Sequence, residues 1–123
     1  MSKKKKIVYV AHPISGDVEG NLDDLARILR IINLDAHPQK HESQLFSFED
    51  VVPQAPYYAD IICLNDNNAL ERKRGIDNDV AMIESGVFDE LWLTGDKISF
   101  GMSEEVKLFL LQGKPIIDYT NKF

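Results

Sequence analysis

The sequence has little cysteine and no long apolar segment. Cys63 is the only cysteine among the 123 residues, which excludes an internal disulfide and any paired-cysteine metal or redox motif. A lone cysteine is typical of a reducing compartment, so we expect a cytoplasmic protein. Only about six apolar residues follow the basic start before His12 and Pro13, too few for a signal peptide or a membrane-spanning helix, so we expect no membrane partner.

Positive charge is scarce as well. The chain has 14 basic and 20 acidic residues, a formal net charge of −6, and four of the basic residues form the run Lys3–Lys6. We interpret residues 1–6 as a basic, flexible tail. Because so acidic a body lacks the broad basic face that a phosphate backbone requires, we expect no polymeric nucleic acid as partner. One phosphate of a small ligand remains compatible, since helix N-termini and loop amides bind phosphate without many lysines.

What the sequence does have is the balance of an ordinary globular protein, with 44% hydrophobic and 28% charged residues. At 123 residues the chain is long enough for one core, so we expect a single domain over residues 1–123. Short apolar runs alternate with segments of helical periodicity. We expect strands at 7–11, 51–53, 89–94 and 116–119, and helices at about 22–32, 69–85 and 103–112. Asn21 and Ser103 are the expected N-caps of the first and last helix.

Two stretches lack a clear period. Residues 35–50 are polar and are expected to form a loop, with one short helix as an alternative. Residues 54–68 are expected to form a long loop with a small helical piece, the kind of segment that often binds ligands. His37 and His41 have a spacing that suits a metal on a helix, but the proline between them argues against a helix and no third ligand is evident. We therefore expect no metal.

The alternation of strands and helices predicts right-handed βαβ units. The expected fold class is α/β: a single-domain three-layer sandwich with a mainly parallel, flavodoxin/Rossmann-like sheet of four to five strands. Ligands of such sheets bind beyond the carboxyl ends of the strands, where the strand order reverses. The loops after the first three strands, residues 12–20, 53 onward and 95–102, should therefore converge.

The first of these loops contains Ser15 and Gly16 ahead of a helix. Its amides could hold an anion, and a plain strand-to-helix turn is the equal alternative. The loop is neither a GxGxxG fingerprint nor a P-loop with its lysine, so no nucleotide cofactor is expected.

The loop after the third strand reads Ser99-Phe100-Gly101-Met102-Ser103-Glu104-Glu105. It is expected to bring two carboxylates into the first turn of the last helix, where the helix dipole keeps a carboxylate ionised and suited to nucleophilic attack. The alternative is the ordinary preference of acidic residues for helix N-termini.

Asp77 and Asp79 precede the third strand and are the candidates for a second carboxylate. Most such charges belong to a solvated helix face. If one of them faces the same crevice as Glu105, the chain has the carboxylate pair that glycosyl transfer requires. A Ser-His-Asp triad lacks support, because no serine lies in a G-x-S-x-G elbow.

Three blocks of sequence resemble the nucleoside 2-deoxyribosyltransferase-like superfamily, which includes nucleotide N-glycosidases. They are VYVAHPISGDVEGN (8–21), NDVAMIESGVFDELWL (78–93) and SFGMSEEVKLFLLQGKPI (99–116). The third is the most specific, because members carry a serine, a glycine two residues later and the catalytic glutamate six residues after the serine. Here these are Ser99, Gly101 and Glu105.

The resemblance implies a role for each matching position. Glu105 is expected to attack C1′ of a nucleoside or its 5′-monophosphate, and Asp79 to protonate the departing base, with Asp77 in reserve. Ser99 and Gly101, beside Met102, are implied in contacts to a 5′-phosphate. The residues implied in binding of base and sugar are His12, Ile14, Ser15 and Gly16, with Asn21 opening the helix behind them. The resemblance also implies no cofactor, a homo-oligomer and glycosidase or transferase activity.

Two alternatives to an enzymatic function remain open from the sequence. Relatives often have arginine where this chain has Ser15 and Phe100, and Arg72 and Arg74 are the available substitutes. A non-catalytic nucleotide-binding or sensing module of the same fold is the first alternative, and a structural protein with a vestigial site is the second. Trp92 is expected to pack in the core, whereas Tyr57 and Tyr58 suit either core packing or stacking on a base.

Overall fold

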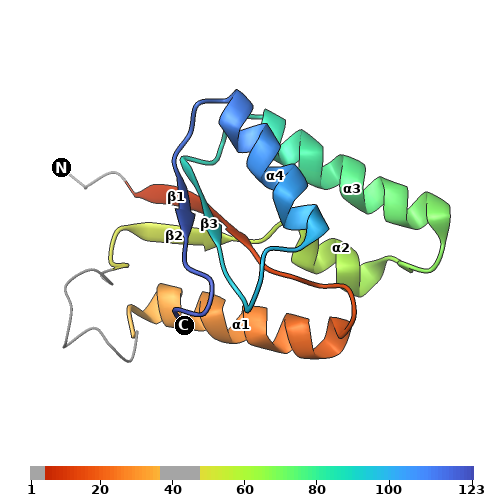
Figure 1. Ribbon diagram of the computed structural model, residues 1–123, viewed down its shortest axis with the longest axis horizontal. Helices are drawn as coiled ribbons and strands as arrows, with labels where there is room; N and C mark the ends of the chain where they lie inside the picture. The colour runs from red at the N-terminus through yellow and green to blue at the C-terminus, as the bar shows by residue number, and fades with distance from the viewer. Residues whose placement is uncertain (1–4, 37–47) are drawn as a thin grey trace.

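A four-stranded, wholly parallel sheet forms the centre of the molecule (Figure 1). The computed structural model describes residues 5–36 and 48–123. The strands are β1 (Lys6–Ala11), β2 (Val51–Gln54), β3 (Glu90–Leu93) and β4 (Ile116–Asp118), in the order β2-β1-β3-β4. The predicted α/β class is confirmed, and each predicted strand is present with ends shifted by a residue or two.

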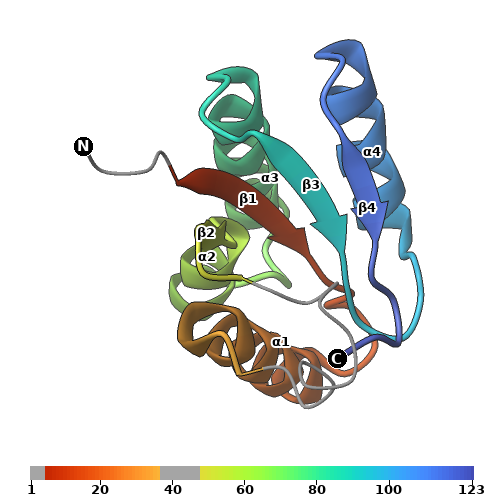
Figure 2. The same cartoon turned by 90° about the vertical axis from the view of Figure 1, so that its left-hand side faces the viewer.

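Helices cover both faces of this sheet. They are α1 (Val18–Leu34), α2 (Tyr57–Cys63), α3 (Ala69–Glu84) and α4 (Phe100–Leu111). Figure 2 shows α1 on one side of the strands and α3 and α4 on the other, which gives the three layers that the sequence predicts. No helix within the described ranges is long and apolar enough to cross a membrane.

Strand β1 divides its side chains between the two faces. Val8 and Val10 pack with α1 in one core cluster, and Tyr9 and Ala11 pack toward α3 and α4 in the other. This division follows from the two-residue period of a strand. Trp92 of β3 is 4% exposed and belongs to the α1 cluster, so its predicted place in the core is confirmed.

Both predicted helix caps are wrong. Helix α1 begins at Val18, and the carboxylate of Asp17 caps it by accepting a 3.1 Å hydrogen bond from the Gly20 amide. Glycine suits this first turn, because a side-chain carbon at Gly20 would lie 2.2 Å from the capping carboxylate. Asn21 is therefore inside the helix. The apolar periodicity of this helix starts at Leu22, one turn after its first residue, so the pattern alone indicates a cap four residues too late.

The last helix also starts earlier than predicted. Ser99, not Ser103, caps α4, with its hydroxyl accepting a 3.3 Å hydrogen bond from the Met102 amide. Glu104 and Glu105 consequently lie beyond the first turn of α4. The dipole argument for an ionised Glu105 does not hold, because the effect falls off within the first turn.

The predicted tail is one residue too long. Lys6 belongs to β1, where its amide donates to the Asp50 carbonyl at 2.8 Å and its Nζ lies 2.7 Å from Oε2 of Glu90. Residues 1–4 and 37–47 lie outside the described residues. They include residues 1–4 of the predicted tail, most of the predicted 35–50 loop and both His37 and His41.

Candidate active site

A cleft of about 730 Å³ lies where the segments after β1, β2 and β3 come together. Helices α2, α3 and α4, the segment between α2 and α3, and Val18 at the start of α1 supply the rest of its lining. The predicted convergence of the three loops is confirmed, and it follows from the parallel strand order. The predicted site residues on the lining are His12, Ile14, Ser15, Asp79, Ser99, Gly101, Met102 and Glu105.

The close approach of two of these loops depends on a glycine. Gly95, shortly after β3, has a φ of +90°, and a side-chain carbon there would lie 2.6 Å from Cδ of Pro13 and 3.2 Å from Nε2 of His12. A positive φ and so short a distance together require glycine. The loop after β3 can therefore pack directly against the residues that follow β1.

Three acidic groups meet on the floor of the cleft. The hydroxyl of Tyr9, from the middle of β1, lies 2.6 and 2.7 Å from the two carboxylate oxygens of Asp79 on α3. The same hydroxyl contacts Oε2 of Glu105 on α4. Asp79 and Glu105 line the cleft, and Tyr9 is fully buried behind them. One strand and two helices thus bring together side chains that are distant in sequence.

These contacts require a shared proton. The hydroxyl of Tyr9 has one hydrogen, so it can donate to one carboxylate and can accept only from a carboxyl that is itself protonated. Within the described ranges no lysine or arginine forms an ion pair with Asp79 or Glu105. One carboxyl of the pair therefore holds a proton while the other is ionised.

The electrostatics of the pair support the same assignment. Burial and the charge of Asp79 raise the pKa of Glu105 well above its ordinary value. Burial also raises the pKa of Asp79, although hydrogen bonds from Tyr9 and Glu105 offset part of that increase. The pKa of Tyr9 is raised well above its ordinary value by burial and by both carboxylates, so its hydroxyl stays a donor. The pair thus binds one proton more tightly than isolated carboxylates do.

His12 lines the cleft, and both nitrogens of its imidazole ring have hydrogen-bond partners. It is 5% exposed, its Nδ1 lies 2.7 Å from the Pro13 carbonyl, and its Nε2 lies 2.8 Å from Oδ2 of Asp24. Burial raises the pKa of Asp24, but hydrogen bonds from His12 and Arg27 outweigh it and leave that pKa below its ordinary value. Asp24 is therefore a fixed anionic acceptor that orients the imidazole.

Three predicted site residues lie outside the cleft lining. Gly16 has a φ of +96° and makes the turn before α1. Asn21 supports the loop, because its side-chain amide donates to the Ile14 carbonyl at 2.9 Å. Asp77 is on the solvent side of α3, where Lys73 pairs with it at 2.6 Å. Helix periodicity explains the last case, since positions two apart on a helix face different directions.

Sequence reasoning did not select Tyr9, although it forms the centre of the acid cluster. Its position within an apolar strand indicates core packing, and it is indeed fully buried. The hydroxyl of Tyr9 is the feature of the sequence that could have indicated this role, because a buried tyrosine hydroxyl needs a hydrogen-bond partner.

Tyr57 also lines the cleft, and its hydroxyl donates to the Val10 carbonyl at 2.7 Å. Of the two candidate cations, Arg72 lines the cleft and Arg74 does not.

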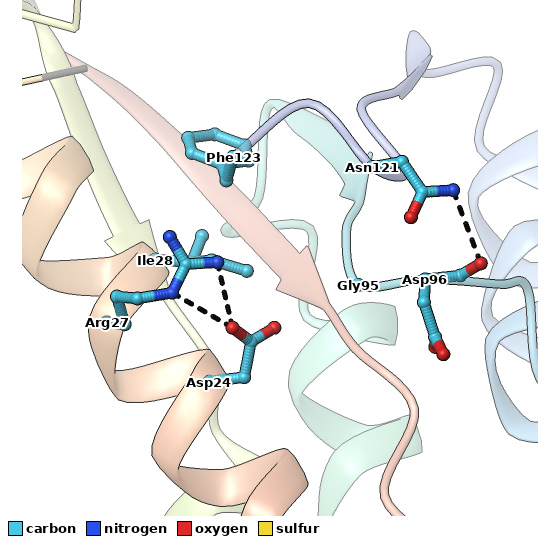
Figure 3. A pocket seen from close by; sticks show the side chains of 7 residues that line it. All are labelled: Asp24, Arg27, Ile28, Gly95, Asp96, Asn121 and Phe123. Atoms are coloured by element: carbon cyan, nitrogen blue, oxygen red, sulfur yellow. Dashed lines mark hydrogen bonds and ion pairs between the residues drawn. The ribbon is translucent and has the colours of Figure 1, made fainter. Parts of the chain in front are cut away.

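A second, smaller pocket of about 120 Å³ lies between α1 and the chain terminus (Figure 3). Its polar groups bond to one another: Arg27 donates to Asp24 at 2.8 and 3.0 Å, and the Asn121 side chain donates to the Asp96 carbonyl at 3.4 Å. The polar groups of this pocket are already paired with one another, and its volume is small. The larger cleft also contains the acid cluster, so we take that cleft as the candidate site.

Residues 6–119 match the family described as "Domain of unknown function (DUF7768)". The chain belongs to this family. The match includes β1, the acid cluster, α4 and the loops of the cleft, so the site described above lies wholly within the family domain. No curated protein matches the chain. Within the described residues, no group of three or more His, Cys, Asp or Glu side chains is arranged to hold a metal ion.

Proposed function

We propose that the protein cleaves or exchanges the N-glycosidic bond of a nucleoside or nucleoside monophosphate, with Glu105 as nucleophile and Asp79 as proton donor. The observation that carries the proposal is the Asp79–Glu105 pair on the cleft floor, joined through one tyrosine hydroxyl. Retaining glycosyl transfer needs one ionised and one protonated carboxyl group close together. A buried acidic pair without a cation is costly for stability, which is typical of functional sites.

The first step uses the pair in its singly protonated form. An ionised Oε atom of Glu105 attacks C1′ of the sugar, and the C1′–O bond forms as the C1′–N bond breaks. The electron pair of the broken bond goes to the base nitrogen, which takes a proton from Asp79. The products are a glycosyl ester on Glu105, a free base and an ionised Asp79. The shared proton rests on Glu105, whose pKa is the more strongly raised, so it passes to Asp79 through the Tyr9 hydroxyl, which contacts both carboxyls, before Glu105 attacks.

The second step resolves the ester. Asp79 takes a proton from water, the water oxygen attacks C1′, and the ester bond breaks to restore the Glu105 carboxylate. If a second base occupies the cleft instead, its nitrogen attacks C1′ and Asp79 accepts its proton. Hydrolysis and transfer therefore use the same two residues and differ only in the acceptor.

The resemblance to the nucleoside 2-deoxyribosyltransferase-like superfamily supports the same roles. Ser99, Gly101 and Glu105, which carry the most specific motif, all line one cleft. His12 and Ser15 line the same cleft, and the resemblance implies that they contact the sugar and base. A vestigial site is the less favoured reading, because Glu105 forms no ion pair within the described ranges and opens onto a large cleft.

Base release tests the proposal directly. The protein is incubated with ribonucleosides, deoxyribonucleosides and their 5′-monophosphates, with and without an acceptor base, and free base is followed by chromatography. Wild type is expected to release base from at least one substrate, and Glu105→Gln is expected to lose about 10⁴-fold or more in rate. Acid quenching followed by intact mass measurement is expected to detect the glycosyl ester in wild type alone.

Glu84→Gln is the matched control. Glu84 is the exposed last residue of α3 and lies outside the cleft lining, so the same chemical change there is expected to alter the rate by no more than about twofold. Absence of base release from every substrate overturns the enzymatic proposal. Calorimetric binding of a nucleoside in that case would support the non-catalytic binding module.

A further inference from the structure

The lining of the cleft is acidic well beyond the pair on its floor. Asp60 on α2, Asp66 before α3, Glu71 on α3 and Glu104 on α4 also line it. Arg72 is the only lysine or arginine among the lining residues, all of which lie in the described part of the chain. A ligand that enters the cleft therefore meets a predominance of negative charge.

Little of this charge is neutralised locally. Glu104 has Lys107 at 3.0 Å, and Oε1 of Glu71 accepts a 3.2 Å hydrogen bond from the Asn65 amide, which leaves its charge in place. Asp60 and Asp66 form no ion pair with any described residue. Asp60 is also close enough to the floor for its charge to raise the pKa of Asp79.

The features that favour an anion are Arg72 and the N-terminus of α4. Arg72 lies seven residues before Asp79 on the same helix, about 10 Å along its axis and on the same face. Glu71 is its direct neighbour. At the α4 terminus, the Ser99 hydroxyl already accepts the Met102 amide, and Glu104 follows within the next turn. Each favourable feature thus has a carboxylate close by.

The remaining lining suits an uncharged ligand. Tyr57, Ile61, Ile76, Phe100 and Leu108 provide apolar and aromatic surface in the same cleft. Phe100 is 81% exposed, an unusual position for a large aromatic side chain, and it stands at the start of α4 beside Gly101. Aromatic rings of this kind stack on bases without requiring a charged partner.

We propose that the cleft selects nucleosides without a 5′-phosphate over the corresponding 5′-monophosphates, with Asp60 and Asp66 as the residues that repel the phosphate. The inference rests on the proposed glycosidic function and narrows its substrate class. A phosphate dianion that enters the cleft is subject to the negative charge of its carboxylates, with Arg72 as the one lysine or arginine among the lining residues, whereas the sugar and base of a nucleoside carry no net charge.

The primary experiment compares kcat/KM for each active nucleoside with that for its 5′-monophosphate at low and at physiological salt. The nucleoside is expected to be preferred by roughly tenfold or more at low salt, and the preference is expected to shrink as salt screens the carboxylates. In parallel, calorimetry measures Kd of both ligands on Glu105→Gln, which keeps the cleft but is expected not to turn substrate over.

Charge variants assign the selectivity to the named residues. Asp60→Asn/Asp66→Asn is expected to reduce the nucleoside preference by roughly three- to tenfold through better use of the monophosphate. Asp23→Asn/Glu84→Gln removes the same charge from exposed positions outside the cleft and is expected to leave the preference unchanged.

Each result has a defined meaning. Equal or better use of the monophosphate, lost in Arg72→Gln, overturns the selectivity and assigns a phosphate site to Arg72, while the glycosidic function stands. Absence of base release together with tighter binding of the nucleoside overturns the glycosidic function and supports the selectivity of the cleft. Absence of both turnover and binding overturns both proposals.

Discussion

The two faces of the sheet are built from alternate residues of the same strands, yet they bury different chemistry. On the α1 face, Val8 and Val10 meet Leu25, Ile28 and Ile32 in an apolar cluster, and the buried carboxylate of Glu90 beside it is paired with Lys6 and accepts a hydrogen bond from Trp92. On the α3 and α4 face, Tyr9 takes the equivalent place in β1, and its hydroxyl meets two carboxyl groups. The α1 face therefore mainly stabilises the fold, whereas the α3 and α4 face contains reactive groups whose burial lowers stability.

The comparison shows how a small α/β domain can hold an uncompensated acidic pair. Apolar contacts continue around the pair, because Tyr9 packs edge-on against Phe88 and Phe109 with ring centroids 5.1 and 5.7 Å apart. The tyrosine ring thus belongs to the core, and only its hydroxyl belongs to the site. Substitutions on the two faces should therefore have different effects, on activity at the α3 and α4 face and on stability at the α1 face.

The largest expected effect is on the reactive face. Asp79→Asn removes the proton donor at nearly constant size and is expected to reduce kcat/KM by about 10²- to 10⁴-fold. The loss should be smaller for 7-methylguanosine, whose base already carries a positive charge and needs no proton to leave. Asp77→Asn, an exposed change on the same helix, is the control and should keep wild-type kinetics. Equal losses for both substrates would contradict the role of Asp79 as proton donor.

The apolar face is tested by a matched pair of leucines on α1. Leu25 is fully buried and Leu34 is 57% exposed. Leu25→Ala is expected to lower the free energy of unfolding by about 2–5 kcal/mol, and Leu34→Ala by less than about 1 kcal/mol. Chemical denaturation measures both values. Activity per folded molecule should persist in both variants, so a selective loss of kcat in Leu25→Ala would show that the faces are not independent.

Removal of the Tyr9 hydroxyl tests whether this one group distinguishes the reactive face from the apolar face. Tyr9→Phe keeps the ring but removes the group that joins the two carboxyls, and it is expected to lower kcat by about ten- to a hundredfold. Because the Tyr9 hydrogen bond lowers the pKa of Glu105, its loss should move the acidic limb of the pH–rate profile to higher pH. Tyr119→Phe removes the same atom from the α1 side and should leave the profile in place.

The smallest expected effect is a pH dependence of stability. The pKa of Glu105 is raised in the folded protein, so the folded state binds more protons than the unfolded state once pH exceeds the ordinary glutamate value. Unfolding free energy should therefore fall as pH rises from that value through the folded-state pKa. Glu105→Gln should flatten this fall and gain on the order of 1 kcal/mol at pH 8. If the free energy of unfolding changed with pH in the same way in wild type and in Glu105→Gln, that result would contradict the raised pKa of Glu105.

Sequence patterns predicted the strands and most helices, because they depend on local periodicity. The apolar run 7–11 and the spacing of apolar residues in 69–85 each indicate their element without reference to the rest of the chain. The caps Asp17 and Ser99 were missed, because several serine, asparagine and aspartate residues near each helix start can play that part. Which of these residues caps the helix depends on where the loop that follows the preceding strand places the start of the helix.

For the candidate site, the parallel strand order is enough to predict which loops meet, because parallel strands end at one edge of the sheet, and the resemblance selects Glu105 and Asp79. The packing of the folded chain, by contrast, turns Asp79 toward the cleft and Asp77 toward solvent, and it brings Tyr9 into contact with both carboxyls. These residues are far apart along the chain, so their contacts depend on how whole elements pack. The rotation of α3 and α4 about their axes is set by their packing against the sheet and against each other, and no local sequence pattern within either helix indicates it.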